Sequence, residues 1–189
     1  MQGERTRGQK FAAMLVGLLG MMSSTAFAVD LSLSGGDGSV AGSLGGRVIP
    51  GLLRADLGYL HTGRGDGNAD VYSGDLLLSP ALPIFHPQVG VRYQYQDSRY
   101  GRGGGLGFGG SLFLGVLPRL QLGVFGFYTP GKSTTGNLRR SVDYGAQAKL
   151  HVVRSLYVSA GYRILRSRFE GGGEHDLYRG PAFSVELGL

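Results

Sequence analysis

Hydrophobic and polar residues alternate along most of the chain from Gly51 to Leu189, and one of the two alternating sets is almost free of charge. Between residues 142 and 152 the even positions are apolar or aromatic, whereas the odd positions are polar or glycine. The same alternation returns in Gln88–Gln96 and in Pro181–Leu189. A period of two residues is that of a β-strand whose two faces meet different surroundings. The pattern therefore predicts an all-β protein with one apolar and one polar wall.

Turn residues divide the chain from Asp30 to Leu189 into ten segments with strand character. Most are about ten residues long, which is the length that a tilted strand needs to cross the hydrocarbon core of a membrane. The predicted strands are Asp30–Gly35, Ser39–Val48, Gly51–Thr62, Asp70–Ser79, Gln88–Gln96, Gly105–Val116, Arg119–Tyr128, Ser141–Val153, Ser155–Arg166 and Pro181–Leu189.

The predicted connections alternate between short and long. Short ones are expected at 49–50, 80–87, 117–118 and around Arg154, and long ones at 61–69, 97–104, 129–140 and 167–180. Barrels of the bacterial outer membrane place short turns in the periplasm and longer loops outside. With the chain ending in the periplasm, we expect an antiparallel transmembrane β-barrel of ten strands if Asp30–Gly35 pairs as the first strand. Eight strands is the alternative if that segment does not pair.

The beginning of the chain has the composition of a secretory leader. Basic residues precede the apolar stretch Phe11–Met22, and the small residues Ala26 and Ala28 suit a signal peptidase. The apolar stretch is too short for a permanent transmembrane helix. We therefore expect a cleaved signal peptide at residues 1–28 and a single domain, the barrel, at residues 29–189.

A soluble lipocalin-like barrel has the same period with its polar face outward, so the orientation of the two faces needs an independent argument. Many of the 36 glycines fall at alternate strand positions on the polar face, where they suit a crowded inner wall better than a solvated surface. Tyrosines on the apolar face lie towards strand ends, as in an interfacial girdle. They are Tyr59, Tyr72, Tyr93, Tyr95, Tyr128, Tyr144 and Tyr162. These observations favour the membrane barrel.

In that orientation the lumen receives charges of both signs. The predicted lumen network is Arg47, Arg54, Asp56, Asp75, Arg92, Asp143, Lys149, Arg163 and Glu186. Opposite charges in a narrow tube pair with one another, because an unpaired ion there loses hydration that it does not recover. Side chains largely fill a barrel of eight to ten strands. We therefore expect a sealed polar core, with a narrow pore for small solutes as the alternative.

The predicted external loops carry more basic than acidic residues. Guanidinium groups suit phosphate oxygens, and the outer leaflet of such membranes presents phosphorylated glycolipid. We hypothesise that Arg139, Arg140, Arg166 and Arg168 contact lipopolysaccharide near the rim of the barrel; ordinary solubilising charge is the alternative. The full chain has a formal net charge of +6, which is too diffuse to indicate nucleic-acid binding.

Enzymatic and metal sites have little support in the sequence. His151 faces inward like Asp143 and Glu186, but no local signature marks a neighbouring serine as a nucleophile. A lipid-modifying enzyme therefore stays a minor alternative. The last predicted long loop contains four residues that could bind a divalent cation, but their spacing matches no metal motif: Glu170, Glu174, His175 and Asp176. The chain has no cysteine, so thiol chemistry and disulfides are absent. We predict no catalytic residues, no metal and no cofactor.

Short motifs in the second half resemble a known family. Phe127–Gly131 (FYTPG), Asp143–Tyr144 and Arg154–Arg163 (RSLYVSAGYR) are similar to the C-terminal half of the YfaZ-type outer-membrane proteins, and the likeness is strongest from Gln88 onward. The resemblance implies an outer-membrane β-barrel without assigned catalytic residues. It also implies insertion by the barrel assembly machinery, which commonly reads a final aromatic residue; this chain has Leu189 there instead.

Overall fold

The computed structural model describes residues 29–36, 38–63, 68–80, 82–153 and 155–188. Ten antiparallel strands form a closed barrel in which each strand pairs with its neighbours in the chain and β1 pairs with β10. The strands are β1 (Val29–Gly36), β2 (Ser39–Ile49), β3 (Leu53–Thr62), β4 (Ala69–Leu78), β5 (Phe85–Ser98), β6 (Gly101–Leu117), β7 (Leu120–Thr129), β8 (Leu138–Val153), β9 (Leu156–Phe169) and β10 (Glu174–Gly188). The prediction of ten strands is confirmed, and the predicted leader at residues 1–28 lies outside the described residues.

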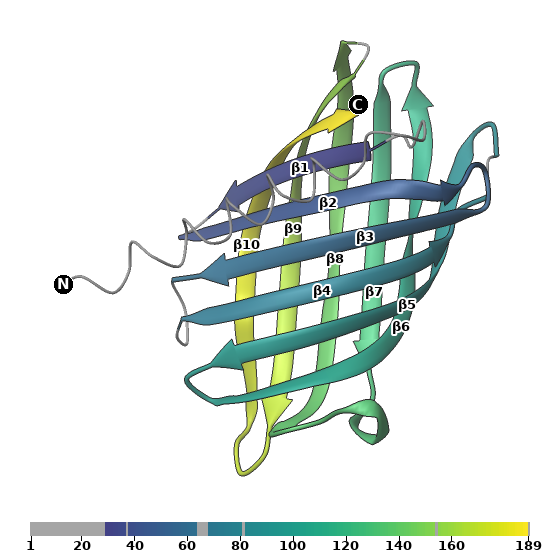
Figure 1. Cartoon of the computed structure of the whole chain (residues 1–189). Helices are drawn as coiled ribbons and strands as arrows, with labels where there is room; N and C mark the ends of the chain where they lie inside the picture. Colours follow the sequence, from purple (N-terminus) through teal and green to yellow (C-terminus); the bar gives the residue numbers. More distant parts are fainter. Residues whose placement is uncertain (1–28, 37, 64–67, 81, 154, 189) are drawn as a thin grey trace.

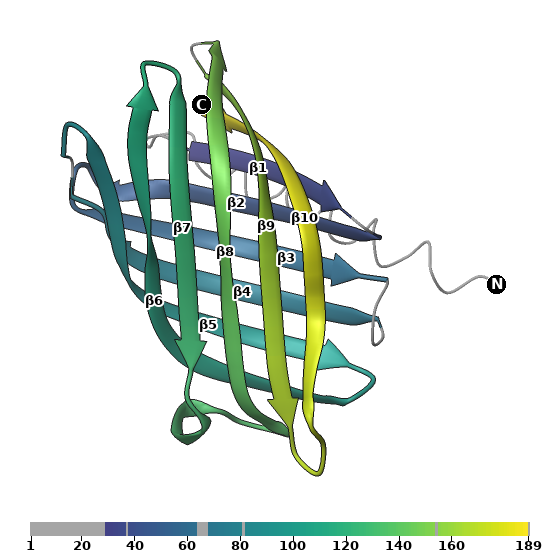
Figure 2. The same ribbon diagram turned by 180° about the vertical axis from the view of Figure 1, so that it is seen from behind.

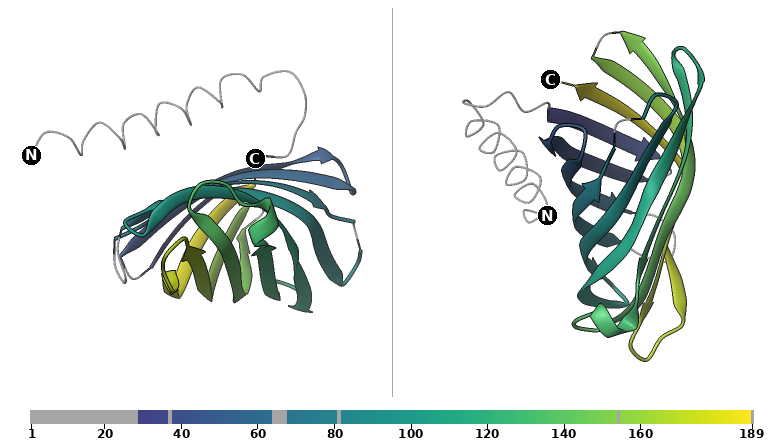
Figure 3. Two further views of the ribbon diagram at one scale, coloured as in Figure 1. Left: turned by 90° about the horizontal axis from the view of Figure 1, so that it is seen from below. Right: turned by 90° about the vertical axis from the view of Figure 1, so that its right-hand side faces the viewer.

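The barrel is strongly flattened. In Figure 1 strands β1–β4 run across the view in front, and β7–β10 cross them steeply behind. Figure 2 shows the same arrangement with β7–β10 in front, and the side view in Figure 3 places the two groups of strands on opposite sides of the molecule. The two groups join along the curved strands β5 and β6 and along the contact between β1 and β10. This shape brings side chains of opposite walls close to one another.

Several strands extend beyond their predicted ends. β5 and β6 leave only residues 99–100 between them, and β9 and β10 leave only residues 170–173. The predicted long connections at 97–104 and 167–180 are therefore mostly strand. Their glycine and charged residues resemble loop sequence, but ladder hydrogen bonds to the neighbouring strand hold them in the sheet. We call this end of the barrel the loop end, and the end with the connections 50–52 and 118–119 the turn end.

The predicted long connection at 129–140 is partly ordered by the neighbouring strand. It contains a short 3-10 helix at Gly131–Ser133. The backbone N–H groups of Thr135 and Asn137 donate to the carbonyl oxygens of Gly104 and Arg102. The connection therefore continues the sheet beside the loop end of β6.

The outer wall carries the apolar face, as the membrane orientation requires. Leu57, Leu76, Val91 and Val124 each expose at least two-fifths of their surface. A contiguous exposed apolar surface of this kind is stable in hydrocarbon and not in water. The structure therefore confirms a transmembrane barrel of the bacterial outer-membrane type. None of the helices in the described residues has the length and apolar character needed to cross a membrane.

Polarity changes in steps along the outer wall. Tyr59, Tyr72 and Tyr95 are register partners on three adjacent strands and form one row towards the loop end. The next outward row contains Asp70 and Asp97, which lie beside each other in register. This succession from aliphatic to tyrosine to charged rows marks the boundary between hydrocarbon and headgroups.

Candidate functional site

Four charged side chains form one network across the middle of the lumen. Arg92 on β5 donates from Nη2 to Asp75 Oδ2 on β4 and from Nη1 to Asp143 Oδ2 on β8, both at 2.7 Å. Arg163 on β9 donates to the same Asp143 carboxylate at 2.8 Å from both Nε and Nη2. Asp143 is 2% exposed. Two positive and two negative groups therefore neutralise one another in the interior.

The other predicted lumen residues lie nearer the turn end. Arg54 binds Asp56 on its own strand and Asp30 on β1, the latter at 2.6 Å. Lys149 and Glu186 pair at 2.6 Å. Arg47 is exposed and has no ion-pair partner among the described residues. Asp30 was missing from the predicted network, although its alternation with Leu31 and Leu33 in β1, the shortest of the ten strands, places it on the inner face.

The Arg92 side chain extends from β5 to β8, because the inner face of the intervening strands β6 and β7 has space for it. Its guanidinium carbon lies 3.6 Å from the centre of the Phe127 ring on β7. The inward positions at the loop end of β6 are glycines, with Gly107 as the register partner of Arg92 itself. Without a Cβ on these residues, side chains from β5 pass over β6 to the strands beyond. The glycines of β6 therefore leave space on the inner wall for the side chains of β5.

We expect Gly103→Ala to destabilise the barrel by about 1–3 kcal/mol, because overpacking of a crowded site costs that much. A Cβ at Gly103 would lie 2.3 Å from the carbonyl oxygen of Thr135 and 2.7 Å from the Leu138 Cβ. Gly115→Ala is the matched control on the same inward face of β6, since its nearest contact would be 3.9 Å away. Urea unfolding in phospholipid vesicles compares the two variants, and equal stability would contradict the crowding argument.

A ladder of neutral hydrogen bonds lies on the loop-end side of the charged network. Gln94 on β5 donates to the Thr129 hydroxyl on β7, and Gln96 on β5 donates to Ser141 on β8, each at 3.0 Å. The Ser167 hydroxyl on β9 donates to Ser141. All of these side chains are buried. These residues do not stand out in the sequence, because inward glutamines and serines occur on most of the strands.

An apolar layer closes the lumen at the loop end. Its members come from both walls and form one buried cluster: Leu60, Ala69 and Val71 from β3 and β4, and Leu138, Leu165, Phe169, Leu177 and Tyr178 from the β8–β10 side. Tyr100, between β5 and β6, packs against it and stacks on His175 with 3.8 Å between ring centres. Leu60, Val71 and Leu165 are apolar residues at inward-facing positions, and this could have been noticed in the sequence. Their positions alone did not indicate that the two walls of the barrel meet there.

A polar cavity of about 560 Å³ occupies the lumen between this layer and the turn end. Leu60 and Val71 line it on the side of the apolar layer, and Arg47 and His86 line it nearer the turn end. All nine predicted lumen residues are in its wall. The cavity thus has charged walls and an apolar end.

No hydrogen bond joins His151 to a serine or a carboxylate among the described residues. Asp143 binds two arginines, and the Ser159 hydroxyl is hydrogen-bonded to Ser184. His151 stacks on Tyr157, and its buried Nε2 has no hydrogen-bond partner in the described part of the chain. The described residues also contain no group of three or more histidine or acidic side chains placed to hold a metal ion.

Three of the four predicted lipopolysaccharide contacts meet at the loop end. Arg139, Arg140 and Arg168 line a surface depression of about 460 Å³ together with Phe169 and Glu170. Arg140 and Arg168 are register partners on β8 and β9 and face outward. Arg139 pairs with Glu170, and Arg140 pairs with Glu174. Arg168 is exposed and has no ion-pair partner among the residues that the structure describes.

Arg166, the fourth predicted lipopolysaccharide contact, forms an ion pair with Asp176. Arg166 donates from Nε to Asp176 Oδ1 at 2.6 Å. The hydrogen bonds from Arg166, helped by the charges of Arg166 and Arg179, lower the pKa of the Asp176 carboxyl. This carboxylate therefore stays ionised at neutral pH and holds Arg166 away from the depression. Arg166 lies in a strand as predicted, but Arg168 lies in β9 and not in the predicted loop at 167–180, because the β9–β10 ladder continues past both residues.

Solved structures of similar fold are membrane proteins with low sequence identity to this chain. The NanC porin is 10% identical, with a TM-score of 0.46 over 87% of this chain and 99% of that one. The outer-membrane channel DcaP of Acinetobacter baumannii is 8% identical, with a TM-score of 0.45 over 88% of this chain and 55% of that one. LpxR from Salmonella typhimurium is 12% identical, with a TM-score of 0.39 over 85% and 81%. At these values the likeness does not transfer a function.

Sequence comparisons assign the chain to a protein family. A comparison with curated protein sequences finds no match. A family model, described as YfaZ precursor, matches residues 9–185 and so covers nearly all of the barrel. The predicted resemblance to the YfaZ family is thereby confirmed. This ten-stranded barrel, with its charged lumen and its arginine-lined rim, belongs to the YfaZ family.

Proposed function

We propose that this outer-membrane barrel is a sealed, surface-binding protein that holds lipopolysaccharide at its rim through Arg139, Arg140 and Arg168. The observation that carries the proposal is the unpaired Arg168 in a depression shared with two further guanidinium groups. Planar guanidinium groups bind phosphate oxygens with two parallel hydrogen bonds, so a cluster of them suits a phosphorylated headgroup.

The position of the depression relative to the membrane supports the same ligand. Arg140 is four residues from Tyr144 on the outward face of β8, and Arg168 is six residues from Tyr162 on β9. Both tyrosines are exposed on the outer wall. Since interfacial tyrosines lie at headgroup level, the guanidinium groups lie just beyond the hydrocarbon, where lipid phosphates are found.

We expect Arg140→Gln with Arg168→Gln to lower the lipopolysaccharide retained by the purified barrel about tenfold or more, because hydrogen bonds to charged groups contribute roughly 1.5–3 kcal/mol each. Native mass spectrometry of the barrel in detergent measures the bound glycolipid. Arg99→Gln with Arg102→Gln is the matched control, because it removes the same charge at the loop end outside the depression. If both double variants retain as much lipopolysaccharide as the unchanged protein, the binding proposal fails.

A narrow channel is the second candidate function, favoured by the polar cavity of about 560 Å³. A solute entering from the turn end would meet paired charges and then the apolar layer. Conduction therefore requires the apolar layer to move. The lumen is better suited to holding the two walls together than to continuous passage.

A further inference from the structure

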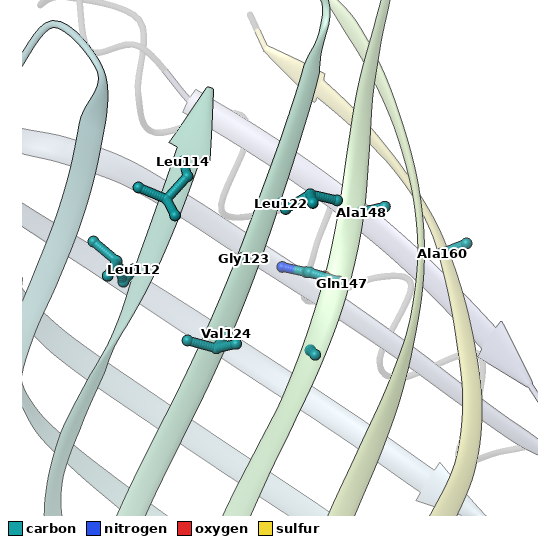
Figure 4. A pocket seen from close by; sticks show the side chains of 9 residues that line it. Leu112, Leu114, Leu122, Gly123, Val124, Gln147, Ala148 and Ala160 are labelled. Atoms are coloured by element: carbon teal, nitrogen blue, oxygen red, sulfur yellow. The ribbon is translucent and has the colours of Figure 1, made fainter. Parts of the chain in front are cut away.

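The outer wall contains a second depression, which is apolar and lies within the membrane-facing surface. It has a volume of about 410 Å³ and crosses β6–β9. Leu112, Leu114, Leu122 and Val124 line one part of it, and Ala146, Ala148 and Ala160 line the other. Figure 4 shows the leucines and Val124 on β6 and β7, with Ala148 and Ala160 on the strands beyond.

The depression results from small residues in two adjacent outward rows. Leu122, Ala148 and Ala160 are register partners on three adjacent strands, and Val124 is the partner of Ala146. The next outward residues towards the turn end, Leu150 and Val158, are large again. Methyl groups between larger aliphatic side chains leave a concave and mostly apolar surface, which Gly123 and Gln147 also line.

We propose that this groove, formed by Leu112, Leu114, Leu122, Val124, Ala146, Ala148 and Ala160, seats an acyl chain of the lipopolysaccharide molecule whose phosphate the rim arginines hold. The inference rests on the proposed function, because it assigns a second part of the same ligand. It adds that the barrel recognises the lipid by its chain as well as by its headgroup.

The spacing of the two depressions fits one lipid molecule. Arg140 and Ala146 lie on the same face of β8, six residues apart, which is about 20 Å along a strand. With the usual tilt of barrel strands, this corresponds to roughly 15 Å of depth, about half of a hydrocarbon core some 30 Å thick. Tyr144 lies between them at the interface. A chain that descends from a headgroup at Arg140 and Arg168 therefore passes the alanines within one leaflet.

A second copy of the barrel fits this surface less well than a lipid chain. In a two-fold dimer the same patch of each subunit faces itself. Two concave grooves would then face each other and leave a void, with the loss of contacts that a void entails. A flexible acyl chain instead fills a groove of this shape and brings no polar group into the hydrocarbon.

A larger side chain in the groove tests whether an acyl chain binds there. We expect Ala148→Phe to lower the retention of complete lipopolysaccharide about threefold or more, because the chain loses its close dispersion contacts. Binding of the water-soluble, fully deacylated headgroup should not change, since the arginines are untouched. Ala55→Phe is the matched control: Ala55 also faces outward, on β3, between Gly46 and Leu76 in register. Ala160→Leu fills the groove with a smaller side chain if Ala148→Phe does not fold.

The outcomes separate this inference from the function on which it rests. If Ala148→Phe and Ala55→Phe retain equal lipopolysaccharide while the rim variants lose it, the groove assignment is wrong and the headgroup site remains. If Ala148→Phe weakens the deacylated headgroup equally, the effect is not on the chain and the assignment is also wrong. Cross-linked dimers of the unchanged barrel that Ala148→Phe abolishes would make a second copy the occupant. If the unchanged barrel retains no lipopolysaccharide, the proposed function itself fails.

Discussion

Asp143→Ala should lower the free energy of unfolding by about 3–5 kcal/mol, the cost of removing one partner from a buried ion pair. Asp143 accepts hydrogen bonds from both Arg92 and Arg163, and its side chain is almost inaccessible. Its removal leaves the Arg92 Nη1 group without its carboxylate inside the lumen. Reversible urea unfolding of the mature barrel in phospholipid vesicles measures the change, with heat-modifiable gel mobility as a check on folding.

Glu186→Ala is the control for this prediction. Glu186 also pairs inside the lumen, with Lys149, but about a fifth of each side chain is exposed. Water therefore replaces part of the lost interaction, and we expect a cost of about 1 kcal/mol or less. Asp143→Asn should fall between the two, because its amide oxygen still accepts a hydrogen bond. Equal losses for Asp143→Ala and Glu186→Ala would show that the central network does not hold the walls together.

The unchanged barrel should show no steady openings in a planar bilayer at neutral pH. The apolar layer joins both walls at the loop end, and a hydrophobic constriction without water does not pass ions. Arg92→Ala removes a lumen cation but leaves that layer, so it should also stay silent. Leu165→Ala combined with Phe169→Ala removes the largest contacts of the layer and should give the first openings.

Conductance would also decide between the two candidate functions. A reconstituted general porin is the control for the bilayer, and the folded state of each variant is checked by gel mobility. Steady openings of the unchanged protein that change in Arg92→Ala or Glu186→Ala would assign the lumen to solute passage. The rim and groove would then have to be reconsidered as secondary features of a channel.

The strand count and the face of each residue could be predicted from the sequence. Strand periodicity depends only on the two-residue repeat of the backbone, so Tyr144 and Ala148 were placed outward, and Asp143 and Lys149 inward, without a structure. The predicted strand ends were less accurate at the loop end. There, Arg168 and Asp176 have loop-like composition, but ladder pairing extends the sheet through them.

The sequence by itself determined a transmembrane barrel with an apolar outer wall and a charged inner wall, because alternation specifies which side of a sheet each residue faces. It favoured ten strands over eight, and the structure decided for ten. Only the tertiary structure decided which inward residues meet. Arg92 reaches Asp143 across Gly107, which has no side chain. Leu60 shares a buried cluster with Phe169, because the flattened sheet brings the two walls together. Contacts between strands that are not neighbours depend on how the barrel closes, and a pattern along one strand carries no information about that closure.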